Sequence, residues 1–363
     1  MKQNNALAYL RQLCCSGLGK EIVIPEFLRS VQTVISSCNN SFAWVDEYLI
    51  PSTFMVEFTN FDVDSGVVLL NYLSMKKNND CFVPWFKQHP VLVEIDVFDE
   101  SFYMSEAYNL VYRLGDQYHP LWALVRQYGK PVGMLGLYRP RQQKPFNQRE
   151  QALCSQLLPY FAHALQAPED NDLQYIENGS SGMIIMDILG SILYLNHEAK
   201  SLLALASHQV FTMDARNKEA ELLAKLAQLC RNLGAIFQGQ AAAPPSWSYT
   251  GPNGRFVFRA YWLDKQNNEP GGLIGMTVEH QEPIVLKILR AMRNLPLSPT
   301  QKEVAVLLVQ GFSNEKIGER LHIKLSTVKD HIGKIFTKLD IHRREELLPM
   351  LMALDSSMPI LKI

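Results

Sequence analysis

The sequence predicts an α+β multidomain protein, with two antiparallel-sheet domains followed by an all-α domain. Its 363 residues exceed the usual size of a single domain. Short segments rich in β-branched and aromatic residues fall into two groups, one before residue 139 and one after residue 182. From Leu297 onward, apolar residues instead recur at steps of three and four, which is the spacing of amphipathic helices.

The first domain begins with helices and continues with strands. Apolar residues between Leu7 and Cys38 predict two helices, with breaks at Gly17, Gly19 and Pro25. Alternating β-branched and aromatic residues then predict strands, with helical pieces between the two halves of the group. The predicted strands are 42–49, 53–58, 67–73, 121–128 and 132–138, and the helical pieces are 83–88 and 105–111.

The segment from Lys130 to Leu165 contains a hairpin turn, a strand, a proline-containing loop and a long amphipathic helix. This order resembles the end of a GAF-type sensor domain. The resemblance implies a six-stranded antiparallel sheet, with helices on one face and a ligand pocket on the other. It predicts a GAF-like sensor domain over residues 1–166.

Aromatic side chains of this domain are candidates to line such a pocket, because small-molecule sites are mostly apolar. The candidate ligand-binding residues are Trp44, Phe58, Tyr72, Trp85 and Trp122. For any one of these residues, a place in the hydrophobic core is the more common outcome. The sequence alone leaves both interpretations open.

A second domain follows a polar linker at residues 167–172. The stretch from Tyr175 to Leu205 predicts a helix, a turn, a strand at 183–187, a tight turn at Leu189–Gly190, a strand at 192–195 and a helix that begins after Asn196. This order resembles the opening of a PAS domain, so we expect a PAS-like sensor domain over residues 173–281. Later segments predict a helix at 219–238 and strands at 247–250, 255–263 and 273–279.

Some PAS domains hold flavin or haem, so both cofactors need consideration. Cys230 does not lie in the reactive-cysteine motif of flavin photosensors. His197 and His208 could ligate haem, but a surface position is much the more common outcome for either residue. The sequence has no C-x-x-C motif and no cysteine–histidine pair at zinc-ligand spacing. We therefore expect neither a cofactor nor a metal.

Residues 282–296 form the predicted linker helix between the second domain and the C-terminal domain. Apolar residues from Ile284 to Met292 recur at helical spacing. This helix could transmit a signal and dimerise, or it could be a plain connector. The pattern supports both interpretations.

The C-terminal segment predicts three short helices. Ser298, Ser313 and the pair Ser326–Thr327 each precede an amphipathic run, as hydroxyl N-caps do. The second and third helices form a helix-turn-helix, in which the third helix enters the major groove of DNA. The candidate DNA-binding residues are Ser313, Asn314, Ser326, Thr327, Lys329, Asp330, Gly333, Lys334, Thr337 and Lys338.

These residue types suit contact with double-stranded DNA. Lysines can meet phosphates or guanine, an aspartate can accept a hydrogen bond from cytosine N4, and Gly333 lets the helix backbone approach the groove closely. Ser313 and Asn314 can add phosphate contacts at a helix N-terminus. Lys302, Lys316 and Arg320 are expected to be solvated charges. The alternative for the whole segment is a small helical bundle with a solvated basic face.

This segment resembles the LuxR/FixJ (GerE-type) helix-turn-helix of bacterial transcription regulators, and we assign the domain to residues 297–355. The matching residues are Leu297, Ser298, Pro299, Glu303, Gly311, Phe312, Ser313, Asn314, Ile317, Leu321, Thr327, Val328, Lys329, His331, Ile335, Lys338, Leu339 and Arg344. Gly318 departs from the pattern by standing where alanine is usual, and should cost the helix about 1 kcal/mol. The resemblance implies an inverted-repeat operator, a homodimer and possible contact with RNA polymerase.

The charge distribution agrees with this interpretation. The net charge of −1 would argue against DNA binding by a single domain, but basic residues gather near the end of the chain. The sequence has no phosphate-binding loop, nucleophile elbow, H-E-x-x-H or kinase signature, so we expect no enzyme. It also has no signal-peptide core and no apolar run long enough to span a membrane, so we expect a cytoplasmic protein.

The sequence therefore predicts a transcriptional regulator whose sensor domains respond to a small-molecule or protein signal and control the helix-turn-helix. Two alternatives stay open. An acyl-homoserine-lactone receptor shares the DNA-binding domain but typically carries one sensor domain. A non-enzymatic scaffold could carry a degenerate DNA-binding tail.

Overall fold

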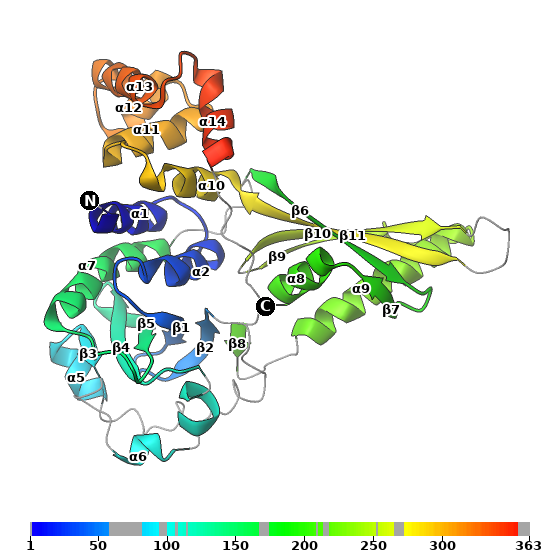
Figure 1. The fold of residues 1–363 in the computed structure, drawn as a ribbon, viewed down its shortest axis with the longest axis horizontal. Helices are drawn as coiled ribbons and strands as arrows, with labels where there is room; N and C mark the ends of the chain where they lie inside the picture. Colours follow the sequence, from blue (N-terminus) through cyan, green and yellow to red (C-terminus); the bar gives the residue numbers. More distant parts are fainter. Residues whose placement is uncertain are drawn as a thin grey trace.

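The computed structural model describes residues 2–57, 82–93, 100–105, 108–113, 115–166, 174–207, 210–212, 218–251, 253–264 and 272–354. Two antiparallel sheets are followed by a group of helices, which confirms the predicted α+β class (Figure 1). The predicted strand 67–73, the linker 167–172, and the residues Phe58, Tyr72 and His208 lie outside the described residues.

The first sheet has six strands in the order β3-β4-β5-β1-β2-β8, and every described pairing is antiparallel. Its strands are β1 (Cys38–Val45), β2 (Pro51–Val56), β3 (Val91–Val93), β4 (His119–Gln127), β5 (Lys130–Arg139) and β8 (Val210–Thr212). The sequence did not predict β8, which leaves the second domain and pairs with the edge of β2. A strand from the predicted second domain therefore belongs to the sheet of the first domain.

Helices α2 (Lys20–Val31) and α7 (Gln148–Ala164) cover one face of this sheet, and α1 (Lys2–Cys14) packs on both helices from the side away from the sheet (Figure 1). Pro25 lies inside α2, so the break predicted there is wrong. Asn147 begins α7 with a capping box, in which its side chain accepts from the Glu150 amide and the Glu150 carboxylate accepts from the Asn147 amide. Phe27, Phe42 and Phe161 are buried between these helices and the sheet.

The opposite face holds a separate aromatic cluster that includes Phe54, Trp122 and Tyr138. It packs against α5 (Phe82–Gln88), α6 (Glu100–Tyr103) and a short π-helix, η2 (Tyr108–Tyr112). The helix predicted at 105–111 is thus found as η2, preceded by the separate turn of α6. Strand β4 is buried along most of its length because both faces of the sheet are covered.

The second sheet has five strands in the order β7-β6-β11-β10-β9. Its strands are β6 (Tyr175–Met186), β7 (Ile192–Leu195), β9 (Ser246–Gly251), β10 (Gly254–Leu263) and β11 (Leu273–Pro283). Helices α8 (His197–Ala206) and α9 (Lys218–Phe237) cover one of its faces and share a core with it. The helix predicted to begin at Tyr175 is wrong, because this segment extends β6 and pairs with the end of β11.

The hairpin between β6 and β7 forms where the sequence predicts it. Gly190 has φ +94°, and a Cβ there would lie 2.4 Å from the Ala227 Cβ, so glycine is required. Asn196 caps α8 by accepting a hydrogen bond from the Ala199 amide at 2.9 Å.

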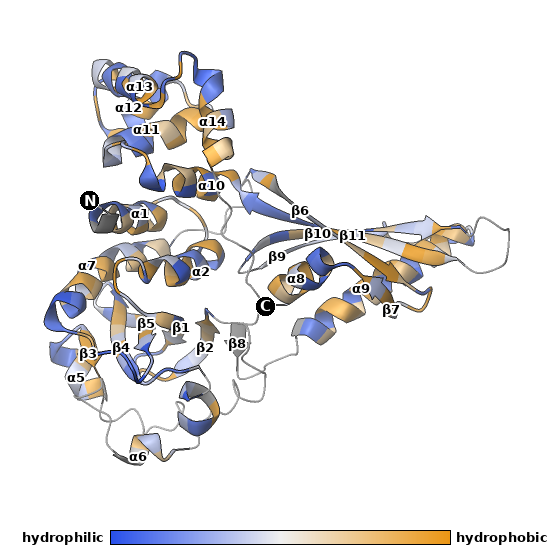
Figure 2. Cartoon of the chain, viewed as in Figure 1, coloured by the Kyte–Doolittle hydropathy of each residue, from blue (hydrophilic) through white to orange (hydrophobic). Residues whose placement is uncertain are grey.

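The remaining helices follow β11 directly. They are α10 (Ile284–Ala291), the 3₁₀ turn η3 (Met292–Asn294), α11 (Pro299–Val309), α12 (Asn314–Leu321), α13 (Leu325–Leu339), the 3₁₀ turn η4 (Arg344–Glu346) and α14 (Leu347–Leu354). Apolar residues of α10 and α14 (Figure 2) join one continuous hydrophobic core with α1, α2, α7 and the first sheet. The apolar face of α10 is therefore packed within the chain, against α1 and α14.

Candidate nucleic-acid interface

Helix α12 begins and ends through local features of the sequence. The Ser313 hydroxyl caps it by accepting from the Lys316 amide at 3.3 Å, as predicted. At the other end, His322 takes a left-handed conformation with φ 53°, and the Ile323 amide donates to the Gly318 carbonyl. The turn at His322 sets the path from α12 into α13.

Gly318 has a packing role in this turn. A Cβ at this position would lie 2.9 Å from the Ile323 carbonyl oxygen, which is closer than real Cβ contacts. The backbone of the turn must therefore shift to admit alanine. The predicted cost of about 1 kcal/mol relative to alanine counted helix propensity alone and left out this contact.

Helix α13 begins at Leu325, with Lys324 at the N-cap position and no side-chain cap. The hydroxyl cap predicted at Ser326–Thr327 is therefore wrong, and both residues lie in the first turn of the helix. Its inner face agrees with the sequence analysis, since Val328, Ile335 and Leu339 are buried and Ile332 is half-buried.

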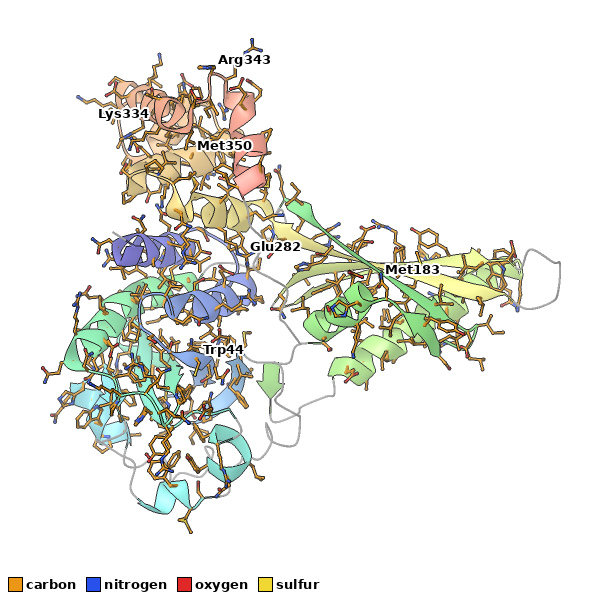
Figure 3. The ribbon with its side chains drawn as sticks, viewed as in Figure 1. Trp44, Met183, Glu282, Lys334, Arg343 and Met350 are labelled. Atoms are coloured by element: carbon orange, nitrogen blue, oxygen red, sulfur yellow. The ribbon has the colours of Figure 1, made fainter. Side chains whose placement is uncertain are left out.

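The opposite face of α13 is polar and open to solvent. Its exposed residues are Ser326, Lys329, Asp330, Gly333, Lys334, Thr337 and Lys338. Six of them, from Lys329 to Lys338, line one shallow open groove. Lys334 points outward at the end of the molecule opposite the first sheet (Figure 3). We refer to these seven exposed residues as the α13 face.

The lysines of the α13 face differ in whether their ammonium groups already have partners within the protein. Lys334 lies 3.5 Å from the Asp330 carboxylate, with both side chains more than half exposed. Among the residues that the structure describes, no ion pair involves Lys329. The Lys338 ammonium instead donates to the Pro296 carbonyl at 2.8 Å and to Gln301 Oε1 at 2.9 Å, so it is engaged within the domain. Lys329 and Lys334 are the lysines best placed to meet a new anionic partner.

The remaining predicted DNA-binding residues lie close to this face. Ser313 is exposed, while Asn314 and Thr327 are half-buried. The Thr337 hydroxyl donates to the Gly333 carbonyl at 2.9 Å, and nothing lies within 4 Å of a Cβ built on Gly333. Sequence reasoning left Lys324 out of the site, but it is exposed at the start of α13.

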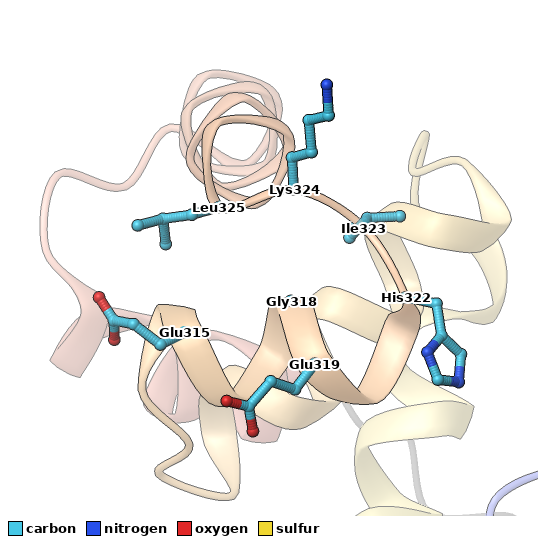
Figure 4. Close-up of a pocket in the computed structure, with 7 residues that line it drawn as sticks. All are labelled: Glu315, Gly318, Glu319, His322, Ile323, Lys324 and Leu325. Atoms are coloured by element: carbon cyan, nitrogen blue, oxygen red, sulfur yellow. The ribbon is translucent and has the colours of Figure 1, made fainter.

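A second groove lies at the turn between α12 and α13 (Figure 4). Glu315 and Glu319 line it from α12, while the Lys324 side chain points away from them. Hydrogen bonds from its own backbone amide and from Ser313, together with the nearby Lys329 charge, lower the pKa of the Glu315 carboxyl. Two carboxylates make this groove unsuited to phosphate, so anionic partners should meet the α13 face instead.

Two basic residues near this face have structural roles. Lys302 was expected to be solvated, but it is buried, and its ammonium lies 3.4 Å from the Arg293 carbonyl. Burial lowers its pKa. Arg344, part of the family pattern, donates at 2.7 Å to the carbonyls of Leu308 and Phe312, and so caps the end of α11.

The predicted ligand-binding residues do not form one set. Trp44 packs edge-on against Phe42, on the face of the first sheet covered by α2 and α7. Trp85 and Trp122 belong to the aromatic cluster on the other face. Trp122 is 4% exposed and donates to the Tyr138 hydroxyl at 3.3 Å, while Trp85 donates to the Val91 carbonyl.

None of the described helices combines the length and the hydrophobicity needed to cross a bilayer. Within the same ranges, no group of three or more histidine, cysteine, aspartate or glutamate side chains is placed to hold a metal ion.

Comparison with known proteins identifies the C-terminal segment. Residues 295–351 match the family described as bacterial regulatory proteins, luxR family. This is a family of regulators, not of enzymes. It covers α11, α12, α13 and most of α14, and so includes the whole α13 face.

Two groups of curated relatives match a short part of this chain. The transcriptional regulator MalT of Vibrio campbellii is 38% identical over 55 residues, which are 15% of this chain and 6% of MalT. The response regulator VraR of Staphylococcus aureus is 34% identical over 50 residues, which are 14% of this chain and 24% of VraR. The chain thus spans a small part of the length of these relatives.

Solved structures show a more distant likeness. A Vibrio cholera VqmA–ligand–DNA complex is 15% identical, covering 50% of this chain and 88% of that chain, with a TM-score of 0.26. The Escherichia coli DhaR(N)–DhaL complex is 12% identical, covering 75% of this chain and 86% of that chain, with a TM-score of 0.24. These scores are too low for any conclusion about this chain.

Proposed function

We propose that this protein is a transcriptional regulator that binds double-stranded DNA through the α13 face. One observation carries the proposal: an exposed polar helix face with two available lysines follows a tight turn from α12, inside the segment that matches the luxR family. A helix presented in this way suits entry into the major groove.

The contacts can be divided by chemistry. Lys329, Asp330 and Gly333 occupy the part of the face that would meet base edges, while Ser313 and Lys334 would contact phosphates. Lys338 contributes less than the sequence suggested, because its ammonium is already bound within the domain. Exchange of Asp330 for asparagine should alter the preferred base next to it.

We further propose that the protein acts in the cytoplasm as a homodimer on an inverted-repeat operator, with RNA polymerase as a possible further partner. A single α13 face offers few cations, and a second copy would double the phosphate contacts. Such a dimer also needs an interface between its two copies. The apolar face of α10, one candidate for it, is already packed against α1 and α14.

The regions before residue 282 are proposed as GAF-like and PAS-like sensor domains that receive a small-molecule or protein signal. A candidate location is the face of the first sheet that carries Trp85 and Trp122, with Phe58 and Tyr72 outside the described residues. Trp44 belongs to the opposite face and is no longer a candidate for the same pocket.

The test is enrichment of random duplex DNA by the full-length protein at two salt concentrations. We expect one palindromic site and an affinity that falls as salt rises. Substitution of asparagine for Asp330 should change the enriched base, with the exposed Lys200→Ala variant on α8 as the control. Enrichment of no sequence would instead favour the scaffold alternative.

An acyl-homoserine-lactone receptor remains the second candidate function. Such receptors typically carry one sensor domain, and this chain has two separate antiparallel sheets before its C-terminal helices. Operator binding that depends on an added acyl-homoserine lactone would favour that alternative.

A further inference from the structure

Helix α10, which leads into the C-terminal domain, meets both sheet-containing regions at one buried polar cluster. We call it the junction cluster, and its members are Tyr9, Glu26, Arg29, Glu282 and Arg290. Tyr9 comes from α1, Glu26 and Arg29 from α2, Glu282 from the end of β11 and Arg290 from α10. The cluster therefore joins elements that are far apart in the sequence.

Glu26 is at the centre of the cluster and is 1% exposed. Its carboxylate accepts from the Tyr9 hydroxyl, from Arg290 at 2.6 Å and from Ser30 at 3.2 Å. Burial by itself would raise the pKa of the Glu26 carboxyl, but the charge and hydrogen bond of Arg290, helped by Arg29, hold it at about 2. Glu26 is therefore a buried anion with several fixed donors.

Arg290 bridges two carboxylates from different parts of the fold. One nitrogen of its guanidinium group contacts Glu26 and another contacts Glu282, each at 2.6 Å. Its side chain is 11% exposed. Figure 3 places Glu282 where β11 meets α10. Because the guanidinium is planar, two short contacts fix the orientation of the side chain and of the helix that carries it.

The cluster also reaches the second sheet through Arg29. Its guanidinium donates to Asn253 Oδ1 at 2.8 Å, and the Asn253 carbonyl accepts from His280 of β11. The turn before β10 is thereby tied to α2. A shift of either sheet would therefore alter the contacts of Glu26 through one or two intervening residues.

Helix α10 connects the junction cluster to the DNA-binding domain. Arg290 lies in its last turn, and η3 and α11 follow. The neighbouring contacts involve α1, since the Arg293 guanidinium lies 5.4 Å from the centre of the Tyr9 ring and the Gln12 side chain donates to the Pro299 carbonyl at 3.1 Å. The start of α11 is thus held against α1.

The same arrangement leaves the α13 face uncovered. Its seven residues are exposed in the part of the chain that the structure describes, and α1 contacts α10, η3 and α11 instead. In Figure 1, α13 lies on the side of the C-terminal domain away from α1. The described contacts therefore constrain the direction in which α13 is presented, without masking it.

We propose that Glu26 and Arg290 are positioning residues that set the orientation of the helix-turn-helix relative to both sheets, so that a signal controls DNA binding by changing this orientation. This inference rests on the proposed function, because orientation matters only if two copies must reach two half-sites. Its direct consequence is a fixed spacing between half-sites, which the junction cluster sets.

The experiment uses full-length protein carrying Glu26→Gln, Arg290→Gln or Arg29→Gln. The variants form a graded series, since Glu26→Gln is nearly isosteric and Arg29 is a rim residue with 26% exposure. Arg259→Gln is the control, because it removes an ion pair between β10 and β11 outside the cluster. Each protein is tested for folding, then for affinity to duplexes with one half-site and with two half-sites at several spacings.

We expect the cluster variants to lose the preference for one half-site spacing but to keep recognition of the half-site itself. Glu26→Gln and Arg290→Gln should lose at least tenfold affinity at the spacing that wild type prefers and accept other spacings, with Arg29→Gln weaker in the same direction. Affinity for one half-site should stay at the wild-type level, as should every property of Arg259→Gln. If only Arg29→Gln folds, the same criterion applies to it.

Two results would overturn the inference. Folded variants with the wild-type spacing preference would show that the cluster is only a stabilising contact. A gain in affinity for a single half-site would show that the sensor regions mask the α13 face. Failure of wild type itself to select any site would instead reject the proposed function.

Discussion

Two ion pairs of this protein differ in every property that governs their role. Glu26 and Arg290 are 264 residues apart in sequence, lie 2.6 Å apart, and are 1% and 11% exposed. Asp330 and Lys334 are one helical turn apart, lie 3.5 Å apart, and are 74% and 61% exposed. The first pair holds parts of the fold together, whereas the second can exchange its partner.

The physical difference comes from solvent. Water and salt screen the Asp330–Lys334 pair, so separating it takes little free energy. Removal of one partner from the buried pair leaves the other charge with little access to water and without its nearest counter-ion, which is strongly destabilising. Four substitution experiments can test this contrast.

Arg290→Met should have the largest effect on stability. It keeps much of the side-chain volume but leaves Glu26 and Glu282 without their shared cation, which should lower the free energy of unfolding by about 3–5 kcal/mol. Urea unfolding of the full-length protein measures this. Lys334→Met on the α13 face is the matched control and should change stability by at most about 0.5 kcal/mol. Equal losses of unfolding free energy in both variants would mean that the buried and the exposed ion pairs do not differ in their effect on stability.

The buried pair should also give stability a specific dependence on acid. Because the folded-state pKa of Glu26 is lowered from its ordinary 4.5 to about 2, its stabilising effect is complete above pH 4.5 and is lost as pH falls towards 2. Within that range the loss approaches about 1.4 kcal/mol per pH unit. The difference in unfolding free energy between wild type and Glu26→Gln should therefore shrink with acidification. A constant difference would contradict the assignment.

Lys329→Ala tests the exposed charges through binding. It should reduce DNA affinity about tenfold and lower the salt dependence by about one counter-ion, because one cation is removed from the α13 face. The stability of the protein should be unchanged. Fluorescence anisotropy with a labelled operator duplex measures both quantities, with Lys200→Ala as control. An unaltered affinity and salt slope would exclude Lys329 from the interface.

The weakest effect should come from the Asp330–Lys334 pair itself. A double-mutant cycle with alanine at both positions should give a coupling energy of about 0.3–0.5 kcal/mol at low salt, falling towards zero at high salt. Urea unfolding at both salt concentrations is the measurement. A coupling energy above about 1 kcal/mol would mean that this pair, like Glu26–Arg290, is structural.

The sequence predicted well those features that depend on near neighbours. The caps at Ser298, Ser313 and Asn196 and the turn at Gly190 are all confirmed. Each involves groups a few residues apart or a backbone angle that one residue type favours, so spacing alone could reveal it. The one cap predicted wrongly is at Ser326–Thr327, because helix α13 begins two residues earlier than a cap at Ser326 would imply.

In the candidate site, too, the sequence predicted features that depend on near neighbours but not contacts between distant elements. Helical spacing was enough to sort the α13 face from the buried Val328 and Ile335. It could not show that Lys302 is buried or that Lys338 is bound to Gln301, because those contacts come from other helices. It also could not separate Trp44 from Trp122, since the face that a strand residue occupies depends on the register of the sheet.

Local periodicity and backbone preferences were sufficient to establish the α+β class, the order of most helices and strands, and the polar face of α13. The folded chain alone reveals that β8 crosses to the first sheet, that α1 packs against α10 and α11, and that Glu26 meets Arg290. Such contacts join residues far apart in the sequence, and their strength depends on exclusion of water, which the whole fold provides.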